Sequence, residues 1–572
     1  MPSPQSLSRF AIVTGARNAW FPLLVLSVTA AWRIVEAADF RYMTLSDALI
    51  AGIAAVIVST WYVVCGRPSF RARSGFIGAL WLFGLVLLTI FKPVYNGDVG
   101  IHGWRLRFAA NRDESLDTTA SHGEATDWHT TPHDFPRYLG GGYWPEVSGV
   151  QLESDWRTHP PQLEWRHEIG AGWSSFAIVG NYAFTQEQRR DREFVSCYRL
   201  DTGEVVWSHA DANRFDPRDI QGGVSGIGPR ATPTIHNARV FSQGATGIVN
   251  CLDAVSGKVL WSHDTCAETG AGVPTYGKSG SPLVVDGKVI ISVGAPKDSA
   301  SRQEFNSSLL AYDAESGAVR WAAGNRPADY ASPIVAKFAG ERQIIVVNEG
   351  YVTSHRATDG AVLWEHPWAG LGDTQETAVQ PIPLAGDRLL LCKGYGYGIS
   401  LLDITRGVDG KFLARPTWNP PIISVLKSKF SNLVLHDGYL YGIDEVLLEC
   451  VELETGKVAW KKRRRPPFGH GQILLIGDAL LVLSETGELA MVQATPDGYH
   501  EMSSIQALDP DDVTWNNLAF STPYLLVRNA REAACYRLPL TGALKVSGNS
   551  ESADRTVWQL RVAAEAGGRI YQ

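Results

Sequence analysis

Eight residues that recur at one position of a repeating unit could together bind an anionic ligand. Four of them are basic or can become cationic and two are tryptophans, in a chain whose formal net charge is −7. Arginine makes bidentate contacts with carboxylates and tryptophan provides a flat stacking face, so the set favours a planar, multiply anionic ligand or a peptide with acidic groups. The alternative is that they are solvated residues around a water-filled opening. These mouth residues are Trp173, Arg230, Lys278, Tyr330, Glu376, Lys429, His470 and Trp515.

The cysteines and histidines do not combine into a metal or redox motif. No two of the seven cysteines form a Cys-x-x-Cys pair, which excludes a zinc ribbon, a haem attachment site and a thioredoxin-type pair. Four cysteines share one position of the repeat, where we expect a slot for a small buried side chain: Cys197, Cys251, Cys450 and Cys535. Four histidines each follow a repeat tryptophan by two residues, in different units, so we expect hydrogen bonds on the rim and no shared metal: His167, His209, His263 and His366.

Two further polar stretches can be interpreted as ordinary surface loops. Gln186, Glu187 and Gln188 follow an apolar run and precede two arginines, and we interpret them as a loop rather than a catalytic group. The basic run at 461–465 is either a solvated loop or a contact with an acidic partner or anionic surface. The net negative charge excludes a broadly basic nucleic-acid-binding protein.

The mouth positions are defined by a repeat in which a glycine precedes a tryptophan by four residues. The pairs are Gly203/Trp207, Gly257/Trp261, Gly317/Trp321, Gly360/Trp364 and Gly456/Trp460, and Trp165 and Trp418 fall in register without the glycine. Successive tryptophans are 42 to 60 residues apart, which is the period of a propeller blade. We expect the tryptophans to pack against the neighbouring blade and assign them no chemistry.

The strand pattern predicts a mainly β fold, one eight-bladed β-propeller over residues 161–541. Pairs of alternating apolar runs joined by tight-turn signals such as Asp286-Gly287 predict eight hairpins. They open near Ser175, Thr232, Ser281, Ser332, Gln380, Asn432, Gln472 and Leu518. The last unit lacks its tryptophan strand, and the missing strand precedes the first unit at Trp165. We therefore expect strands from both ends to close the ring, which removes the exposed edges of an open array.

The first 95 residues are predicted to be a membrane anchor with two or three transmembrane helices, at about 19–35, 45–65 and 75–91. The runs 48–65 and 75–91 carry no charge, and about 17–20 apolar residues span a bilayer. The first run is either a helix or a signal-like segment. Arginines before the first run and between the second and third place the carboxy-terminal part outside the cytoplasm if there are three helices, and inside if there are two. Residues 96–160 are predicted to be a linker and residues 542–572 a tail.

The repeat, with an acidic residue usually preceding its glycine, resembles the tryptophan-docking repeat of PQQ-type eight-bladed propellers. This family includes quinoprotein alcohol and glucose dehydrogenases and BamB-like outer-membrane assembly lipoproteins. The resemblance covers about residues 134–540. The chain looks most similar to membrane-anchored PQQ-like repeat proteins of planctomycete-type bacteria, in the stretches Asp134–Gly140, Gly172–Ala177, Phe184–Gln188 and Gly280–Val285.

The resemblance implies two functions from different classes. The first is a scaffold of the BamB-like type in the inner membrane, its propeller on the periplasmic side, binding an envelope protein or an anionic ligand at the mouth without turnover. The alternative is a PQQ-dependent dehydrogenase that oxidises alcohols or sugars, with PQQ held by the mouth residues. The chain lacks the vicinal Cys-Cys pair of the alcohol dehydrogenases, and their Glu, Asn and Asp calcium ligands cannot be placed in it, so we expect the scaffold. A sugar- or peptide-binding sensor has no dedicated motif.

Overall fold

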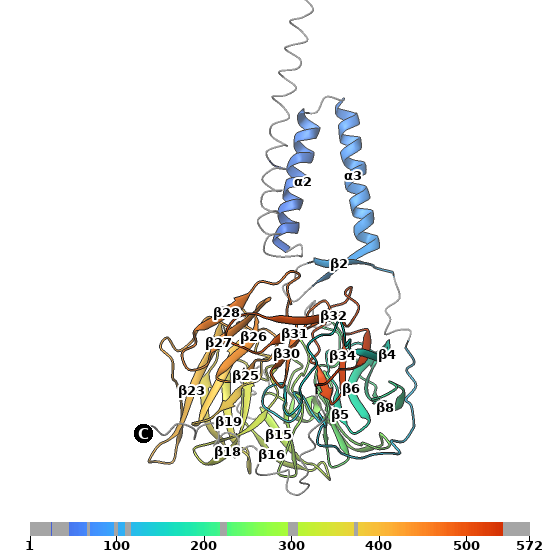
Figure 1. Ribbon diagram of the computed structural model, residues 1–572. Helices are drawn as coiled ribbons and strands as arrows, with labels where there is room; N and C mark the ends of the chain where they lie inside the picture. The colour runs from blue at the N-terminus through green and yellow to red at the C-terminus, as the bar shows by residue number, and fades with distance from the viewer. Residues whose placement is uncertain are drawn as a thin grey trace, which may run out of the picture. The chain divides into compact units, whose positions relative to one another are not determined.

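Eight antiparallel sheets stand around one axis as the blades of a propeller, which confirms the predicted fold (Figure 1). The computed structural model describes residue 25 and residues 45–65, 69–95, 101–108, 116–217, 226–295, 307–370 and 376–541. In seven blades four consecutive strands follow one another outwards from the axis, and in the eighth the outermost strand, β4, comes from the start of the propeller. The predicted hairpins therefore open at the innermost strands, as expected.

The strands of the first four blades are β5 (Ala177–Val179), β6 (Tyr182–Arg189), β7 (Arg192–Arg199), β8 (Val205–Asp211); β9 (Thr234–His236), β10 (Arg239–Gln243), β11 (Ile248–Asp253), β12 (Val259–Asp264); β13 (Leu283–Val285), β14 (Lys288–Ser292), β15 (Leu309–Asp313), β16 (Val319–Ala323); and β17 (Ile334–Phe338), β18 (Glu341–Asn348), β19 (Tyr351–Arg356), β20 (Val362–Pro367). Those of the last four are β21 (Ile382–Leu384), β22 (Arg388–Lys393), β23 (Gly398–Arg406), β24 (Phe412–Pro416); β25 (Val434–His436), β26 (Tyr439–Asp444), β27 (Leu447–Glu452), β28 (Val458–Lys462); β29 (Gln472–Ile476), β30 (Ala479–Leu483), β31 (Glu488–Gln493), β32 (Glu501–Gln506); and β33 (Ala519–Ser521), β34 (Tyr524–Arg528), β35 (Glu532–Arg537), β4 (Gln162–Glu168). A short helix, α5 (Thr265–Thr269), follows β12.

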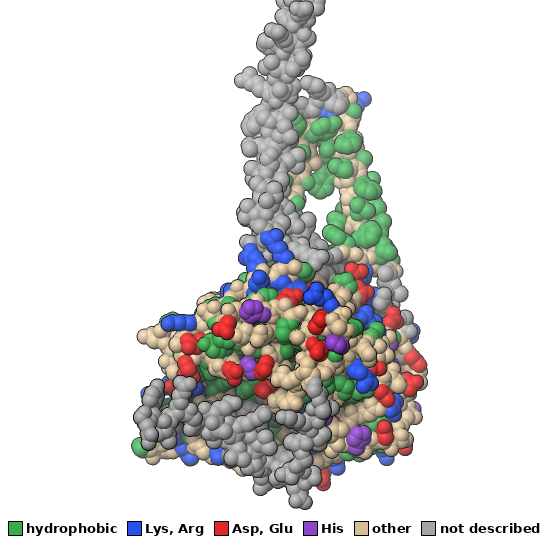
Figure 2. All heavy atoms as spheres, in the orientation of Figure 1, with side chains coloured by type: hydrophobic (Ala, Val, Ile, Leu, Met, Phe, Trp, Pro, Cys, Tyr) green, Lys and Arg blue, Asp and Glu red, His purple; other side chains and the backbone are tan. Residues whose placement is uncertain are grey.

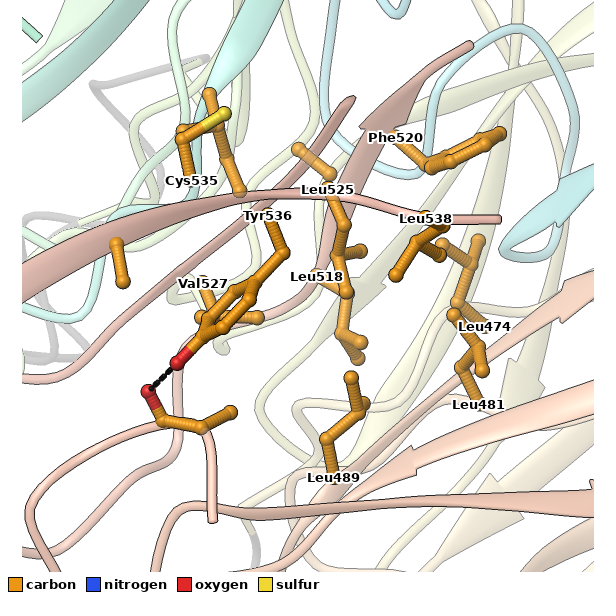
Figure 3. Close-up of a cluster of buried hydrophobic side chains, with 14 of the residues drawn as sticks. Leu474, Leu481, Leu489, Leu518, Phe520, Leu525, Val527, Cys535, Tyr536 and Leu538 are labelled. Carbon is orange, nitrogen blue, oxygen red and sulfur yellow. Dashed lines mark hydrogen bonds between the residues drawn. The ribbon is translucent and has the colours of Figure 1, made fainter. Parts of the chain in front are cut away.

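The core lies between blades, because both faces of each inner strand are covered by neighbouring sheets. Such strands are apolar throughout rather than alternating, as in Ala479–Leu483, where all five residues are buried. Figure 3 shows side chains of the seventh blade, including Leu474 and Leu481, in one packed layer with Leu518 and Leu525 of the eighth. This layer is part of a larger cluster that also includes residues of the first blade and of the segment before it.

The ring is closed by strands from the two ends of the propeller, as predicted. Strand β4 pairs antiparallel with β35, and Trp165 lies opposite Cys535. The guanidinium of Arg528, which is fully buried in the eighth blade, adds hydrogen bonds to the first blade, at Thr185 Oγ1 (2.8 Å) and the carbonyl oxygen of Gln186 (3.1 Å). The ring is therefore closed both by backbone hydrogen bonds between β4 and β35 and by buried side-chain hydrogen bonds from Arg528 to the first blade.

The repeat glycine and tryptophan make a defined contact between neighbouring blades. A Cβ at Gly257 would lie 2.5 Å from the ring of Trp207, and one at Gly317 would lie 2.7 Å from the ring of Trp261, so each indole rests on the glycine of the next blade. The indole N–H of Trp207 donates to the carbonyl oxygen of Ala254, at 3.0 Å, in that next blade. The predicted small-residue slot is the position paired with the tryptophan on the adjacent strand, where Cys197 lies opposite Trp207, fully buried.

One member of the tryptophan series departs from the pattern. Trp418 lies beyond the outer strand β24 rather than in it. Ile423 takes the place beside the glycine of the next blade, where a Cβ at Gly456 would come within 2.3 Å of its Cδ1 atom. The indole N–H of Trp418 nevertheless donates to the carbonyl oxygen of Glu454 in the next blade (3.4 Å), so Trp418 keeps the hydrogen bond of the repeat tryptophans and loses only their contact with the glycine.

Residues 116–160, called the strap below, run along the propeller where the sequence predicts a linker. Phe135 bridges to Ile178 of β5, and the carbonyl oxygen of Pro136 accepts from the backbone N–H of Ile235 in β9 (2.7 Å). Farther along, β3 (Glu146–Val147) pairs parallel with the end of β29. The strap thus forms backbone hydrogen bonds with the inner strands of three blades.

The amino-terminal part contains two described helices and a hairpin. Helix α2 spans Leu45–Cys65 and helix α3 spans Phe70–Ile90. By length and composition α3 could cross a membrane, whereas the apolar run in α2 is shorter, Leu49–Val64. Figure 2 shows hydrophobic side chains along α3. Strands β1 (Phe91–Tyr95) and β2 (Ile101–Leu106) pair antiparallel, in a region expected to have no strand.

Helix α3 begins five residues before the predicted run 75–91. The side chain of Ser69 caps it by accepting from the N–H of Ala72 (3.4 Å), so the helix includes Arg71 and Arg73, which the charge-free criterion left out. Apart from Val25, the predicted helix at 19–35 lies outside the described residues, and so does the tail at 542–572.

Candidate binding site at the mouth of the propeller

The mouth residues all lie just before the start of an innermost strand, and four neighbouring blades bring aromatic side chains into a chain of contacts there. The rings of Trp173 and Trp515 have centroids 4.7 Å apart. Phe430 lies next to Trp515, at 5.1 Å, and next to His470, at 5.6 Å. Trp173, Trp515 and Phe430 are half-buried and His470 is buried. These four residues form an aromatic wall on one side of the mouth.

Two of the predicted cationic residues are engaged with the protein's own backbone. Lys278 is buried, and its ammonium donates to the carbonyl oxygen of Val293. Arg230 donates to the carbonyl oxygens of Gly226 (2.9 Å) and Gly228, and its guanidinium lies over the ring of Phe215 at 4.7 Å. Burial lowers the pKa of Lys278 and lowers that of Arg230 to about 10. Neither cation is presented to the mouth as a simple solvated charge.

Lys429, which precedes Phe430 of the aromatic wall, and the tyrosines of the third and fourth blades complete the set. The ammonium of Lys429 lies 5.3 Å from the ring centre of Tyr395, in a cation–π contact. Tyr330 packs against Tyr276, with ring centroids 5.6 Å apart, and its hydroxyl accepts from the backbone N–H of Tyr276 (3.4 Å). The mouth therefore has aromatic surface on both sides.

The part of the mouth near Glu376 is acidic, which the sequence analysis did not anticipate. One carboxylate oxygen of Glu376 is buried without a hydrogen-bond partner among the described residues. Asp329, buried beside Tyr330, accepts from the backbone N–H of Thr377 (2.9 Å). Burial raises the pKa of Asp329 and lowers that of the nearby Lys393, while the two opposite charges partly offset both effects. Neither Asp329 nor Lys393 carries a sequence signal, because each lies beside the mouth position rather than at it.

Glu187 and its neighbours are structural. Gln186, Glu187 and Gln188 lie within β6 and are buried, so their interpretation as a loop was wrong. Glu187 accepts from Arg189 (2.8 Å) and from the hydroxyl of Tyr198 (2.6 Å). These partners lower its pKa to about 2 although burial opposes ionisation. These partners all belong to the first blade, so the carboxylate of Glu187 has a structural role there.

Behind the mouth, polar residues at the starts of the inner strands link neighbouring blades around the axis. In each link a backbone N–H donates to the side chain of the equivalent residue in the next blade, over 2.7–3.1 Å. The linked residues are Ser175, Thr232, Ser281, Ser332, Gln380 and Asn432. The amide of Asn432 also donates to the hydroxyl of Tyr138 from the strap (2.8 Å), so the strap reaches this ring from the far end of the axis.

The contacts at the mouth do not fit PQQ. A planar ligand between two rings needs roughly 7 Å, twice the ~3.5 Å contact between carbon atoms, and Trp173 and Trp515 lie closer than that. Lys278 and Arg230, which would hold its carboxylates, are bonded to backbone carbonyls. Within the part of the chain that the structure describes, no group of three or more His, Cys, Asp or Glu is placed to hold a metal ion. We therefore derive no step through this cofactor.

Two of the five residues in the basic run at 461–465 form ion pairs with neighbouring carboxylates. Arg464 pairs with Glu488 (2.6 Å) and Glu501 (2.7 Å), and Lys461 pairs with Asp444 and with Glu449 (3.6 Å). Figure 2 shows acidic and basic side chains interspersed over one face of the propeller. Lys462, Arg463 and Arg465 of the same run are exposed, so the ion pairs offset only part of its positive charge.

A family model described as outer membrane protein assembly factor BamB matches residues 162–462, more than half of the 572 residues. The chain belongs to the BamB-like propeller family. This BamB-like chain is 23% identical over 329 residues to the outer membrane protein assembly factor BamB of Moranella endobia, covering 47% of this chain and 79% of that protein. It is 32% identical over 127 residues to the dehydrogenase subunit of a quinone alcohol dehydrogenase of Komagataeibacter europaeus, covering 21% of this chain and 15% of that protein.

Solved structures resemble the BamB-like propeller at low identity. The BamB structure from Moraxella catarrhalis is 15% identical, with a TM-score of 0.47, and the match covers 66% of this chain and 99% of that one. A quinohemoprotein alcohol dehydrogenase from Pseudomonas putida HK5 is 13% identical, with a TM-score of 0.46, covering 71% and 81%. The similarity to planctomycete-type proteins stays an expectation from the sequence.

Proposed function

We propose that this BamB-like protein is a binding scaffold of the cell envelope, anchored in the inner membrane with its propeller on the periplasmic side, and that it is not an enzyme. The helix α3 supports the anchor, since its 21 residues are long and apolar enough to span a bilayer. The BamB relatives support the envelope. The arginines flanking the apolar runs support the orientation if three helices span the membrane.

The observation that carries the scaffold proposal is the half-buried aromatic wall of Trp173, Trp515 and Phe430. Energetically dominant residues of protein interfaces are enriched in Trp, Tyr and Arg and lie in partly enclosed surfaces. Here the wall adjoins Lys429, which precedes Phe430 in the chain, so a partner segment that pairs apolar side chains with an acidic one would be complementary. We therefore propose that an envelope protein with such a segment binds at the mouth.

Site-specific photocrosslinking in cells tests this binding surface. A photoreactive residue replacing Trp515 is expected to give a discrete adduct, and one replacing the exposed Val259 of an outer strand is expected to give none. The adduct should be lost when Trp173→Ala removes the opposing ring. Equal adducts at both positions, or an adduct that is unaffected by Trp173→Ala, would contradict binding at the mouth.

Two measurements separate the scaffold from the dehydrogenase and test the anchor. PQQ with calcium is titrated into the full-length protein in detergent while dye-linked oxidation of alcohols and aldoses is followed; saturable binding with turnover would replace the scaffold proposal. For the topology, alkaline phosphatase is fused after residue 541. We expect it to be active and membrane-bound, whereas an inactive fusion would place the propeller in the cytoplasm.

A further inference from the structure

A β-hairpin follows helix α3 directly, so it lies at one end of the apolar span. Strand β1 begins at Phe91, the residue after Ile90, and pairs antiparallel with β2, which Figure 1 shows at the end of α3. The backbone N–H of Arg107, just after β2, donates to the carbonyl oxygen of Ile90 (2.6 Å), and its guanidinium donates to that of Leu88 (3.2 Å). Carbonyl oxygens in the last turn of a helix lack donors within the helix, so these bonds satisfy two of them and hold the hairpin there.

The register of the two strands gives the hairpin two chemically different faces. Residues directly opposite in an antiparallel pair share a face, and successive residues alternate between faces. One face is apolar and consists of two such pairs, Phe91 with Leu106 and Pro93 with Trp104. On the other face, Lys92 lies opposite Arg105. This part of the hairpin is therefore amphipathic, with apolar side chains on one face and basic ones on the other.

The apolar face is open rather than packed into a core. Trp104 is 53% exposed and Leu106 is 50% exposed, and Phe108, just after β2, is 80% exposed. The surface continues that of α3, where Phe83 and Leu85 are exposed in the same way. Tryptophan is enriched at the level of the lipid headgroups, where one end of its ring system meets hydrocarbon and the other meets water. The end of an apolar span is the place where such a face would meet that layer.

The basic face is complementary to an anionic surface. Like charges directly opposite on a sheet destabilise it, and Lys92 and Arg105 form such a pair. Arg107 adds a third basic residue, against one acidic residue in the sequence 91–108. Lysine and arginine side chains can lie along apolar surface while their charged ends reach lipid phosphates, and anionic lipids attract them. Phospholipid headgroups therefore offset the repulsion at the depth where the apolar face needs cover.

We propose that this hairpin, strands β1 and β2, is a membrane-interface anchor. Its apolar face enters the boundary between acyl chains and headgroups, and its basic face binds the phosphates of anionic phospholipids. The proposal rests on the membrane anchor proposed above, and it holds for either orientation of α3. The chain then leaves the membrane surface after the hairpin rather than at the end of the helix.

Quenching by nitroxide-labelled lipids tests the depth of the hairpin in the full-length protein reconstituted in vesicles. A fluorescent amino acid replaces Trp104 in one sample, Leu80 at the middle of α3 in a second, and the exposed Val259 of the propeller in a third. We expect a nitroxide near the headgroup to quench residue 104 at least about twofold more than one at the end of the acyl chain, with the reverse order at residue 80. Residue 259 should be quenched by neither.

The same samples separate the hairpin from the helix. If residue 80 is not quenched, the membrane anchor is wrong and the hairpin proposal fails with it. If residue 80 is quenched and residue 104 is not, α3 still spans the membrane, but water or protein covers the hairpin, and the interface anchor alone is refuted.

Vesicle composition tests the role of the basic face. The headgroup nitroxide should quench residue 104 more strongly in equal parts of phosphatidylcholine and phosphatidylglycerol than in phosphatidylcholine alone, and Arg105→Gln should remove most of this gain. Arg342→Gln is the matched control, since Arg342 belongs to the propeller and pairs with Asp286 (2.7 Å), and it should leave the gain unchanged. If Arg105→Gln does not fold, Lys92→Gln replaces it. Equal quenching in the two lipid mixtures, or a gain that survives in the hairpin variant, would overturn the binding of anionic headgroups.

Discussion

The contact between repeat glycine and tryptophan can be tested by comparing two glycines that differ only in what faces them. Gly257 has φ +70° and a Cβ there would lie 2.5 Å from the ring of Trp207, whereas Gly287 has φ +68° and no atom within 4 Å of such a Cβ. Replacing either by alanine places an L-residue in the left-handed region, at a cost of about 1–2 kcal/mol. Only Gly257→Ala also forces an overlap with the indole.

The size of the extra effect follows from how firmly Trp207 is held. Its side chain is fully buried, its indole N–H donates to Ala254 (3.0 Å), and its ring packs against Phe184 with centroids 5.8 Å apart. The overlap is about 1 Å against an ordinary carbon contact of ~3.5 Å, and overpacking of this kind costs about 1–3 kcal/mol. Gly257→Ala should therefore lower the free energy of unfolding by about 2–5 kcal/mol, and Gly287→Ala by about 1–2 kcal/mol.

Urea titration of the full-length protein in detergent, followed by far-ultraviolet circular dichroism, measures both variants against the wild type. The midpoint should fall clearly further for Gly257→Ala than for Gly287→Ala. If the two midpoints fall equally, a Cβ at residue 257 has no cost beyond that of the left-handed backbone. The idea that the packing of Trp207 requires glycine there would then be refuted. The wild type and both variants are measured in the same detergent and at the same protein concentration, so these conditions do not contribute to the difference.

Three further perturbations test other parts of the propeller. Arg528→Met should lower the free energy of unfolding by about 2–4 kcal/mol, measured by urea titration, because it leaves the buried carbonyl oxygens of Gln186 and Gly170 without this donor; a loss under about 1 kcal/mol would mean that the strand ladder alone closes the ring. Burial raises the pKa of Glu193 to about 8, above its unfolded value of about 4.3, so between these pH values the folded state keeps a proton that the unfolded state releases. The free energy of unfolding therefore falls as the pH rises through this range. Glu193→Gln should gain stability relative to the wild type from about pH 5 to about pH 8, and identical pH profiles would contradict this. Tyr138→Phe removes the acceptor for the Asn432 amide and should speed proteolysis of the strap, with a stability loss of about 1 kcal/mol, whereas unchanged cleavage would show that other contacts hold it.

The repeat allowed the fold to be predicted because its signals are local to each blade. The spacing of Gly257 and Trp261, and the small residue at Cys251, come from contacts that every blade repeats, so a periodic pattern in the sequence reflects a periodic structure. The missing strand at the end of the last unit likewise required a partner, and Trp165 was the segment that could supply it. The periodic pattern did not indicate that Ile423, in the loop after Trp418, lies beside the glycine of the next blade.

The sequence indicates which residues precede the inner strands, but not the state of their side chains. Trp173 and Trp515 hold equivalent positions in the repeat, and their rings lie side by side. It does not indicate whether a long side chain points to the axis or bends back, and Lys278 is bonded to the carbonyl oxygen of Val293 instead. The sequence did not indicate Asp329 as a buried residue, because the residues that cover it belong to the next blade.

By itself the sequence determined the propeller, its number of blades, its closure and the segments that could enter a membrane, because each of these follows from spacing or from the length of an apolar run. Only the tertiary structure decided that the strap bonds to the inner strands and that Tyr138 meets Asn432. Those contacts join residues as many as 294 positions apart. They leave no period in the sequence, because each is made once and depends on which surfaces the closed ring brings together.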